Sequence, residues 1–190
     1  MSNSLVAFLS QFRPIPADDR VLLETVFENR TYQEGDYLFR TGHICQEIFF
    51  ICNGVLRIVV TNEKGNEETH YFLKEQQFCT ILNSFKNRIV AQESIQAACD
   101  TEVLAISRMK LGELYDQIPY LQGLIDQIIQ QGLIDKINLR NAYLGQDSTT
   151  RYRLFLRHQP EIAQRIPLSD VASYLGITPQ SLSRIRKNRR

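Results

Sequence analysis

The sequence has 190 residues, a formal net charge of +1 at pH 7 and a hydrophobic fraction of 43%. This length suits one large domain or two small ones, with enough apolar material for a buried core. No apolar run is long enough to span a membrane, and the N-terminus lacks a basic segment and a cleavage signal, so we expect a soluble cytoplasmic protein without a membrane partner.

Basic residues are concentrated at the C-terminal end. Residues 145–190 contain nine Lys or Arg and three Asp or Glu, a net charge of +6. The other 144 residues contain 13 basic and 18 acidic residues, a net charge of −5, and the two parts together give the overall +1. This segregation indicates that the tail meets a polyanion. The alternative is a basic tail that contacts only solvent.

Neither the cysteines nor the histidines have the spacing of a metal or catalytic site. The cysteines lack C-x-x-C spacing, so we expect free buried thiols and no zinc or iron–sulfur cluster. The histidines form no ligand or triad pattern with Ser or Asp, so we do not expect an enzyme. These residues are Cys45, Cys52, Cys79, Cys99, His43, His70 and His158.

Two helices are expected at the N-terminus, over residues 3–12 and 17–27, because apolar residues recur there at helical spacing. From residue 29 to 108 the pattern changes to short strands separated by glycine-containing turns, with a tight turn at Asn53-Gly54. We therefore predict an α+β protein with an antiparallel β-barrel, of the double-stranded β-helix or jelly-roll type, because closure removes exposed sheet edges. The clearest strands are residues 48–52, 55–60, 95–98 and 103–107.

A long helix is expected over residues 120–144, with Pro119 in its first turn. Its apolar stripe is wider than a contact with a small barrel requires, which favours a coiled contact between two copies of the chain. The alternative is a helix that packs only on its own barrel. The residues expected at the dimer interface are Leu121, Ile125, Ile128 and Gly132.

A hinge at residues 145–148 leads to a further helix over residues 149–158, capped by Ser148 or Asp147, and Pro160 and Pro167 bound a short connector. The next stretch, LSDVASYLGITPQSLSRIRK at residues 168–187, predicts a helix-turn-helix.

In this stretch Gly176 supplies the positive φ of the turn, and the small Ala172 lies where the two helices cross. Thr178 is a suitable N-cap and Pro179 a suitable first residue for the second helix. We expect this second helix to enter the major groove of DNA. The alternative is a pair of amphipathic helices in a bundle. The exposed face of the second helix would carry Gln180, Ser181, Ser183, Arg184 and Lys187.

The order of helix, glycine-punctuated barrel, long helix and helix-turn-helix resembles the Crp/Fnr family of transcription regulators. The barrel stretch is similar to the family's cyclic-nucleotide-binding-type domain in Gly35, Gly42, Gly65, IFFICNGVLRI at residues 48–58 and TEVLAIS at 101–107. The tail YLGITPQSLSRIRK at 174–187 resembles the family's recognition segment, particularly the short form common in Bacteroidetes. The resemblance implies a sensor domain at residues 1–118, a dimerisation helix at 119–144 and a DNA-binding domain at 145–190.

The resemblance also has departures in the barrel. Cyclic-AMP-binding members carry a Gly-Glu pair and, about ten residues later, an Arg-Ser or Arg-Thr pair. Here Cys79-Thr80 and Ala91-Gln92 stand near those positions, and Arg88 has the wrong offset. Burying a phosphate without an Arg partner is unfavourable, so we expect neither cyclic AMP nor cyclic GMP, while another small effector stays open. The candidate effector residues are Cys79, Thr80, Arg88, Ala91 and Gln92.

The family usually has a β-hairpin wing around the helix-turn-helix. Here we expect wing contacts to phosphate to be missing or minimal, with the basic C-terminal residues in their place. The family's base readers carry over onto Pro179, Gln180 and Arg184, of which Gln180 can pair with adenine and Arg184 with guanine. Ser181 is a phosphate candidate. The full candidate DNA-binding set is Thr178, Gln180, Ser181, Ser183, Arg184, Arg186, Lys187, Arg189 and Arg190.

These patterns predict a homodimeric regulator that binds a palindromic duplex, with RNA polymerase as a further candidate partner. The alternative function is a small-molecule sensor module that acts through protein partners. The two differ in salt dependence, because only a DNA reader loses affinity steeply as salt rises.

Overall fold

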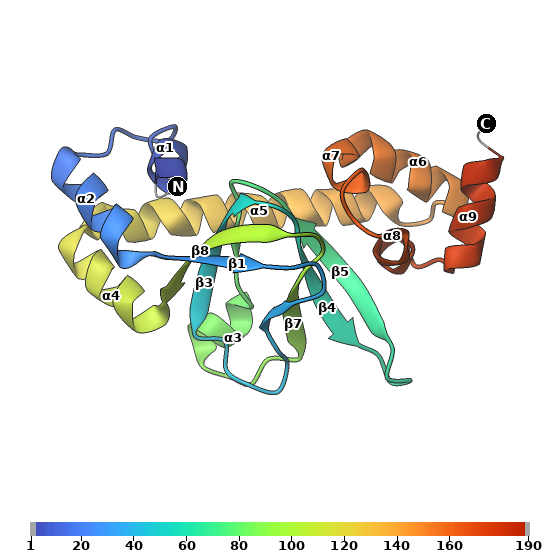
Figure 1. Cartoon of the computed structure of the whole chain (residues 1–190), viewed down its shortest axis with the longest axis horizontal. Coiled ribbons are helices and arrows are strands. Elements are labelled where there is room, and N and C mark those ends of the chain that lie inside the picture. Colours follow the sequence, from blue (N-terminus) through green and yellow to red (C-terminus); the bar gives the residue numbers. More distant parts are fainter. Residues whose placement is uncertain (1–2, 189–190) are drawn as a thin grey trace.

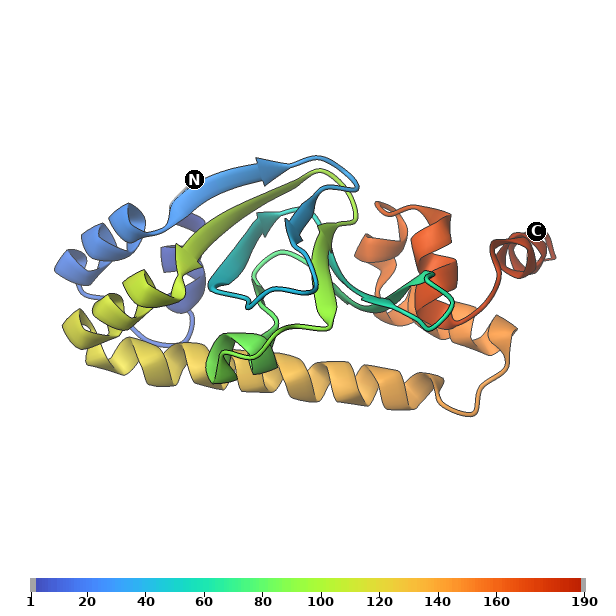
Figure 2. The ribbon, with the colours of Figure 1, turned by 90° about the horizontal axis from the view of Figure 1, so that it is seen from below.

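The protein is described by a computed structural model that covers residues 3–188. The molecule is elongated, and one long helix, α5 (Pro119–Tyr143), runs along most of its length. The N-terminal helices lie at one end of α5, the C-terminal helices at the other, and the strands lie beside its middle (Figure 1; Figure 2). The described residues contain no helix that is long and apolar enough to cross a membrane.

Within residues 3–188, eight strands form two four-stranded antiparallel sheets. The first has the order β1 (Glu28–Tyr32), β8 (Thr101–Ser107), β3 (Glu47–Asn53) and β6 (Phe78–Cys79). The second has the order β2 (Tyr37–Phe39), β7 (Glu93–Ala97), β4 (Leu56–Thr61) and β5 (Glu67–Leu73). Apolar side chains fill the space between the sheets, among them Phe49, Ile51, Leu56, Ile95 and Val103. The predicted α+β, jelly-roll-like arrangement is therefore confirmed.

The Asn53-Gly54 turn joins the two sheets and is not a hairpin between neighbouring strands. β3 ends at Asn53 in the first sheet, and β4 begins at Leu56 in the second. Gly54 has a φ of +106°, and a Cβ atom there would lie 2.3 Å from Thr101 Oγ1. The crossing thus requires glycine both for its backbone conformation and for the close approach of β8.

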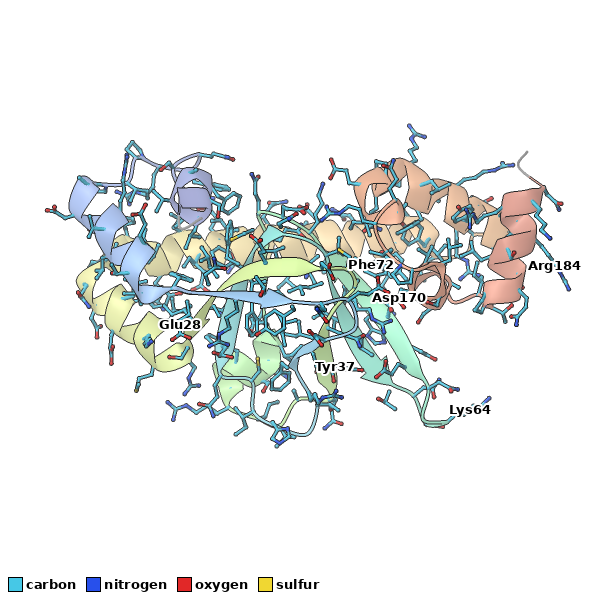
Figure 3. The ribbon with its side chains drawn as sticks, viewed as in Figure 1. Glu28, Tyr37, Lys64, Phe72, Asp170 and Arg184 are labelled. Atoms are coloured by element: carbon cyan, nitrogen blue, oxygen red, sulfur yellow. The ribbon has the colours of Figure 1, made fainter. Side chains whose placement is uncertain are left out.

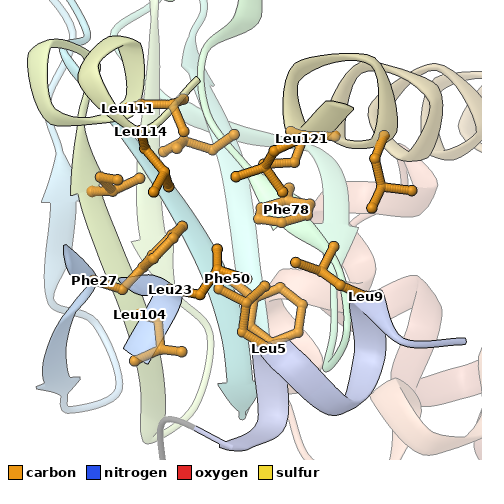
Figure 4. Close-up of a cluster of buried hydrophobic side chains, with 14 of the residues drawn as sticks. Leu5, Leu9, Leu23, Phe27, Phe50, Phe78, Leu104, Leu111, Leu114 and Leu121 are labelled. Carbon is orange, nitrogen blue, oxygen red and sulfur yellow. The ribbon is translucent and has the colours of Figure 1, made fainter. Parts of the chain in front are cut away.

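A second core lies outside the sheets, against α5. The helices α1 (Asn3–Leu9), α2 (Ala17–Val26) and α4 (Arg108–Gln117) pack with the start of α5 on the outer face of the first sheet. Figure 4 shows this cluster, in which apolar side chains from helices and strands meet. Its members include Leu5, Leu9, Leu23, Phe27, Phe50, Phe78, Leu104, Leu111, Leu114 and Leu121.

The short elements β2, β6 and the helix α3 (Leu82–Asn87) are among those to which the sequence-based prediction gives no range, because each is too short for a periodic pattern to be recognised. The C-terminal part contains α6 (Ser148–His158), α7 (Pro160–Ala163), α8 (Leu168–Leu175) and α9 (Pro179–Lys187). The expected connector at residues 160–167 therefore includes a helical turn, α7. Asp147 caps α6 by accepting the backbone N–H groups of Thr149 and Thr150.

Candidate functional site

The α8–α9 pair has the local geometry of a helix-turn-helix. Gly176 ends α8 in the left-handed region, with a φ of +63°, and the N–H of Ile177 donates to the carbonyl of Ala172 at 3.0 Å. The Thr178 hydroxyl accepts the backbone N–H of Ser181 at 3.1 Å, so it caps α9 as expected. Arg151 of α6 donates to the carbonyl of Leu175 and so supports the end of α8.

The outer face of α9 is basic and open to solvent. Arg184, Arg186 and Lys187 are exposed and form no ion pair or hydrogen bond through their side chains with another part of residues 3–188. Figure 3 shows Arg184 extending away from the rest of the chain. Gln180 and Ser183 are also exposed, whereas Ser181 is half-buried and its hydroxyl lies 3.0 Å from that of Thr178. Arg189 and Arg190 lie outside the described residues.

The helix-turn-helix packs on the outer face of the second sheet, a contact that sequence patterns do not indicate. Arg57 of β4 donates to Asp170 of α8 at 2.9 Å, and the Thr69 N–H of β5 donates to the Ser173 hydroxyl at 2.8 Å. The Phe72 ring lies 5.0 Å from the Tyr174 ring, centroid to centroid.

Two of the four residues expected at the dimer interface are buried in the core of their own chain. Leu121 and Ile125 have exposed fractions of 0% and 2%, because the start of α5 packs on α1, α4 and the first sheet. This position corrects the expectation that they face a second copy. Ile128 is half-buried against the same core, and Gly132 faces a groove. The apolar residues of α5 that remain exposed lie further along it, chiefly Ile134 and Ile137.

The expected effector residues do not converge on one open cavity. Cys79 and Ala91 are buried among the apolar side chains between the sheets, and burial raises the pKa of the Cys79 thiol to about 12. Thr80 donates its hydroxyl to the carbonyl of Glu47 at 2.8 Å. Arg88 and Gln92 are exposed, and Arg88 ends α3 in the left-handed region. The expected set therefore divides between core and surface.

No cluster of three or more His, Cys, Asp or Glu residues within 3–188 could hold a metal ion. The four cysteines are free, with Cys45 and Cys79 buried and Cys52 and Cys99 half-buried. The Cys52 pKa is raised by burial.

Comparisons with known proteins agree with this architecture. Residues 29–118 match the family described as cyclic nucleotide-binding domain. A search among curated proteins found no significant match.

Several solved structures are similar to nearly the whole chain. The regulator CLP of Xanthomonas campestris, described as c-di-GMP responsive, has 16% identity and a TM-score of 0.71, with 91% of each chain covered. FixK2 of Bradyrhizobium japonicum has 14% identity and a TM-score of 0.72 over 86% of this chain and 84% of its own. A regulator assigned to the Crp/Fnr family, from Eubacterium rectale, has 16% identity and a TM-score of 0.67 over 96% of this chain and 87% of its own.

The likeness of these structures extends beyond the matched domain into the C-terminal helices. Residues 29–118 thus match the cyclic nucleotide-binding domain family, and nearly the whole chain has the fold of the solved structures of CLP and of the Crp/Fnr-family regulator.

Proposed function

We propose that this protein is a homodimeric, sequence-specific DNA-binding transcription regulator. Residues 1–118 act as the sensor domain, residues 119–144 as the dimerisation helix and residues 145–190 as the DNA-binding domain. The observation that carries the proposal is the outer face of α9, whose three described basic side chains are exposed and unpaired on a helix that is capped at Thr178.

The side chains of α9 divide into base readers and phosphate contacts. Gln180 and Arg184 lie one turn apart on the exposed face, where Gln180 can pair with adenine and Arg184 with guanine O6 and N7. Arg186 and Lys187 suit phosphate, which fixes position without reading sequence. Ser183 is a further candidate, whereas the hydroxyls of Thr178 and Ser181 serve the cap. Arg189 and Arg190 extend the proposed phosphate-binding set beyond the described residues.

Dimerisation would occur through the exposed apolar residues of α5. Ile134 and Ile137 are 50% and 55% exposed, and they lie in the half of α5 nearest the DNA-binding domain. Two copies joined there would carry two α9 helices, as a reader of a palindromic site requires. RNA polymerase is a further candidate partner of the DNA-bound dimer.

Cyclic AMP and cyclic GMP are not the proposed effectors. Cys79 and Ala91, near the positions that hold the ribose and phosphate in cyclic-AMP-binding members, are buried among apolar side chains. The exposed Arg88 does not supply a buried cation. A cyclic phosphate buried there without a cationic partner would be strongly unfavourable.

Selection of bound duplexes from a random pool, with and without cyclic AMP or GMP, tests the proposal. We expect enrichment of a palindromic site, and an affinity that falls linearly with salt on a log–log scale, because bound phosphates release counterions. Enrichment that depends on cyclic nucleotide would overturn the effector proposal. If no site is enriched and binding is insensitive to salt, the alternative of a sensor that acts through protein partners is favoured.

A further inference from the structure

A groove of about 410 Å³ lies between α5, the end of α1 and the chain that enters β6. This volume lies within the range of about 300–1,000 Å³ that is usual for small-molecule pockets. Its walls are largely apolar, and aromatic rings face the middle of α5 across it. The apolar lining includes Phe8, Phe12, Phe78, Ile128, Ile129 and Leu133.

One residue that lines this groove is a lysine without a carboxylate partner among the described residues. Lys136 of α5 is half-buried, and burial lowers the pKa of its ammonium. Its Nζ lies 5.5 Å from the centroid of the Tyr71 ring, and it forms no ion pair within residues 3–188. Three other lysines, Lys74, Lys86 and Lys110, do pair with a carboxylate. A partly desolvated cation with only a ring as its partner favours a bound anion.

The neighbouring carboxylate does not neutralise this lysine. Asp135 also lines the groove, but it accepts a hydrogen bond from the Gln131 side chain at 2.9 Å and forms no ion pair with a described residue. Cys79, whose charge would also influence Lys136, stays a neutral thiol because burial raises its pKa to about 12. Lys136 is therefore the basic side chain of this groove, and no carboxylate among the described residues pairs with it.

The groove continues toward the DNA-binding part of the chain. A second hollow of about 440 Å³ shares Gly132 and Lys136 with the first and reaches Arg157 and His158 at the end of α6. Lys74 in that hollow pairs with Glu161, whereas Arg157 is exposed and has no ion pair among the described residues. An acid on Lys136 would thus lie at the junction of the two hollows, on the side that leads to α6.

The face of α5 that lines the groove differs from the face proposed for dimerisation. Gly132 and Lys136 are four residues apart and share one face, whereas Ile134 lies about 200° and Ile137 about 100° from Lys136 around the axis. A second copy that contacts Ile134 and Ile137 therefore leaves the groove open.

We propose that this groove binds a small organic anion with an apolar body. The body packs against the aromatic and aliphatic walls, and the carboxylate or phosphate pairs with the ammonium of Lys136. Under the proposed function, on which this step rests, such a ligand is the effector, because its charged end lies next to α6 and can bias the position of the DNA-binding helices.

The test uses the full chain and titration calorimetry with octanoate, 4-phenylbutyrate and octyl phosphate, each compared with the matching alcohol. We expect the acids to bind at least about tenfold more tightly than the alcohols, because a hydrogen bond to a charged group is stronger than a neutral one. Lys136→Gln should remove this preference and Lys136→Arg should keep it, while Lys64→Gln, at an exposed turn, should change nothing. If no acid is preferred over its alcohol, the proposal is wrong.

A second pair of variants separates a ligand groove from a subunit contact. A Cβ at Gly132 would meet nothing within 4 Å, so Gly132→Leu should fill the groove, abolish acid binding and leave the dimer intact. Gly123→Leu is the matched control, because Gly123 is also unobstructed on α5 but does not line the groove. Loss of the dimer in Gly132→Leu with acid binding retained would overturn the proposal. DNA affinity without ligand, measured in parallel, tests the proposed function separately.

Discussion

The guanidinium of Arg57 on β4 lies 2.9 Å from the carboxylate of Asp170 in the first turn of α8, although the two residues are 113 positions apart. Arg57 also donates to the Gln96 side chain at 2.7 Å and to the Thr69 hydroxyl at 3.0 Å. Both ion-pair partners are largely buried, with 12% and 14% of their side chains exposed. The second sheet and α8 are therefore joined directly, and not only through α5.

Asp170→Ala should weaken this junction by about 1.5–3 kcal/mol, the range for a hydrogen bond to a charged group. The loss should not exceed this range, because Arg57 keeps its other acceptors. Equilibrium unfolding in urea measures the change. Glu161→Ala is the control, because Glu161 pairs with Lys74 between the same two parts but is exposed, so its loss should cost less than about 1 kcal/mol. Equal losses in the two variants would contradict a special role for the buried pair.

Two carboxylates of this junction should respond to pH in opposite directions. Burial alone would raise the pKa of Glu75, but hydrogen bonds from Arg165 and from the Gly54 N–H bring it below its usual value of 4.5. Burial raises the pKa of Asp170 above its usual 3.8, against the effect of Arg57. The ionised Glu75 therefore stabilises the folded protein above about pH 4.5, and this contribution is lost as pH falls through the folded-state pKa of Glu75. The ionised Asp170 instead destabilises the folded protein, and this cost is relieved as pH falls toward 3.8 and Asp170 becomes protonated.

Glu75→Gln should consequently be less stable than the parent chain above about pH 5, and the difference should narrow as pH falls below 4.5. For Asp170→Asn, the stability of the parent chain relative to the variant should instead increase as pH falls toward 3.8. Urea unfolding at several pH values from 3.5 to 6.5 checks both variants. A constant difference for Glu75→Gln across this range would show that the pKa of Glu75 is the same in the folded and unfolded states.

Long periodic segments could be predicted from the sequence, whereas contacts between distant segments could not. The apolar repeat of α5 and the Gly176, Thr178 and Pro179 signals of the helix-turn-helix depend on local conformation, and the structure reproduces them. The Asn53-Gly54 signal marks a turn but does not say which sheet the chain enters next. The Arg57–Asp170 pair and the burial of Leu121 depend on how elements pack, which a single sequence does not encode as a local pattern.

Thr178→Ala should destabilise α9 by about 1 kcal/mol, because the hydroxyl that accepts the Ser181 N–H is lost at the N-cap. Its effect on DNA affinity should be the same for specific and non-specific duplexes, since the cap orders the helix and reads no base. Thr178→Ser keeps the acceptor and should behave like the parent chain. Urea unfolding and fluorescence anisotropy with two duplexes measure these effects; a change in base preference in Thr178→Ala would indicate a direct contact.

Arg184→Ala and Lys187→Ala should affect DNA binding differently, although both side chains are exposed cations on α9. Loss of Arg184 should cost about 1–3 kcal/mol at the selected site and relax preference at one base position. Loss of Lys187 should weaken all duplexes alike and reduce the salt slope by about 1. Fluorescence anisotropy titrations over a salt series, with the selected site and its single-base variants, distinguish the loss of base preference from the uniform loss of affinity. If neither substitution changes DNA affinity, α9 is not the helix that reads DNA.

Ile137→Asp and Leu121→Ala should separate subunit association from folding. Ile137 is 55% exposed, so a charge there should dissociate the proposed dimer while the chain stays folded. Leu121 is fully buried in the core beside α1 and α4, so its truncation should cost about 2–5 kcal/mol of folding stability. Met109→Asp is the control, because it places the same charge at an exposed apolar residue of α4, away from α5. Sedimentation velocity over a concentration series reports association, and a dimer that persists in Ile137→Asp would place the subunit contact on another surface.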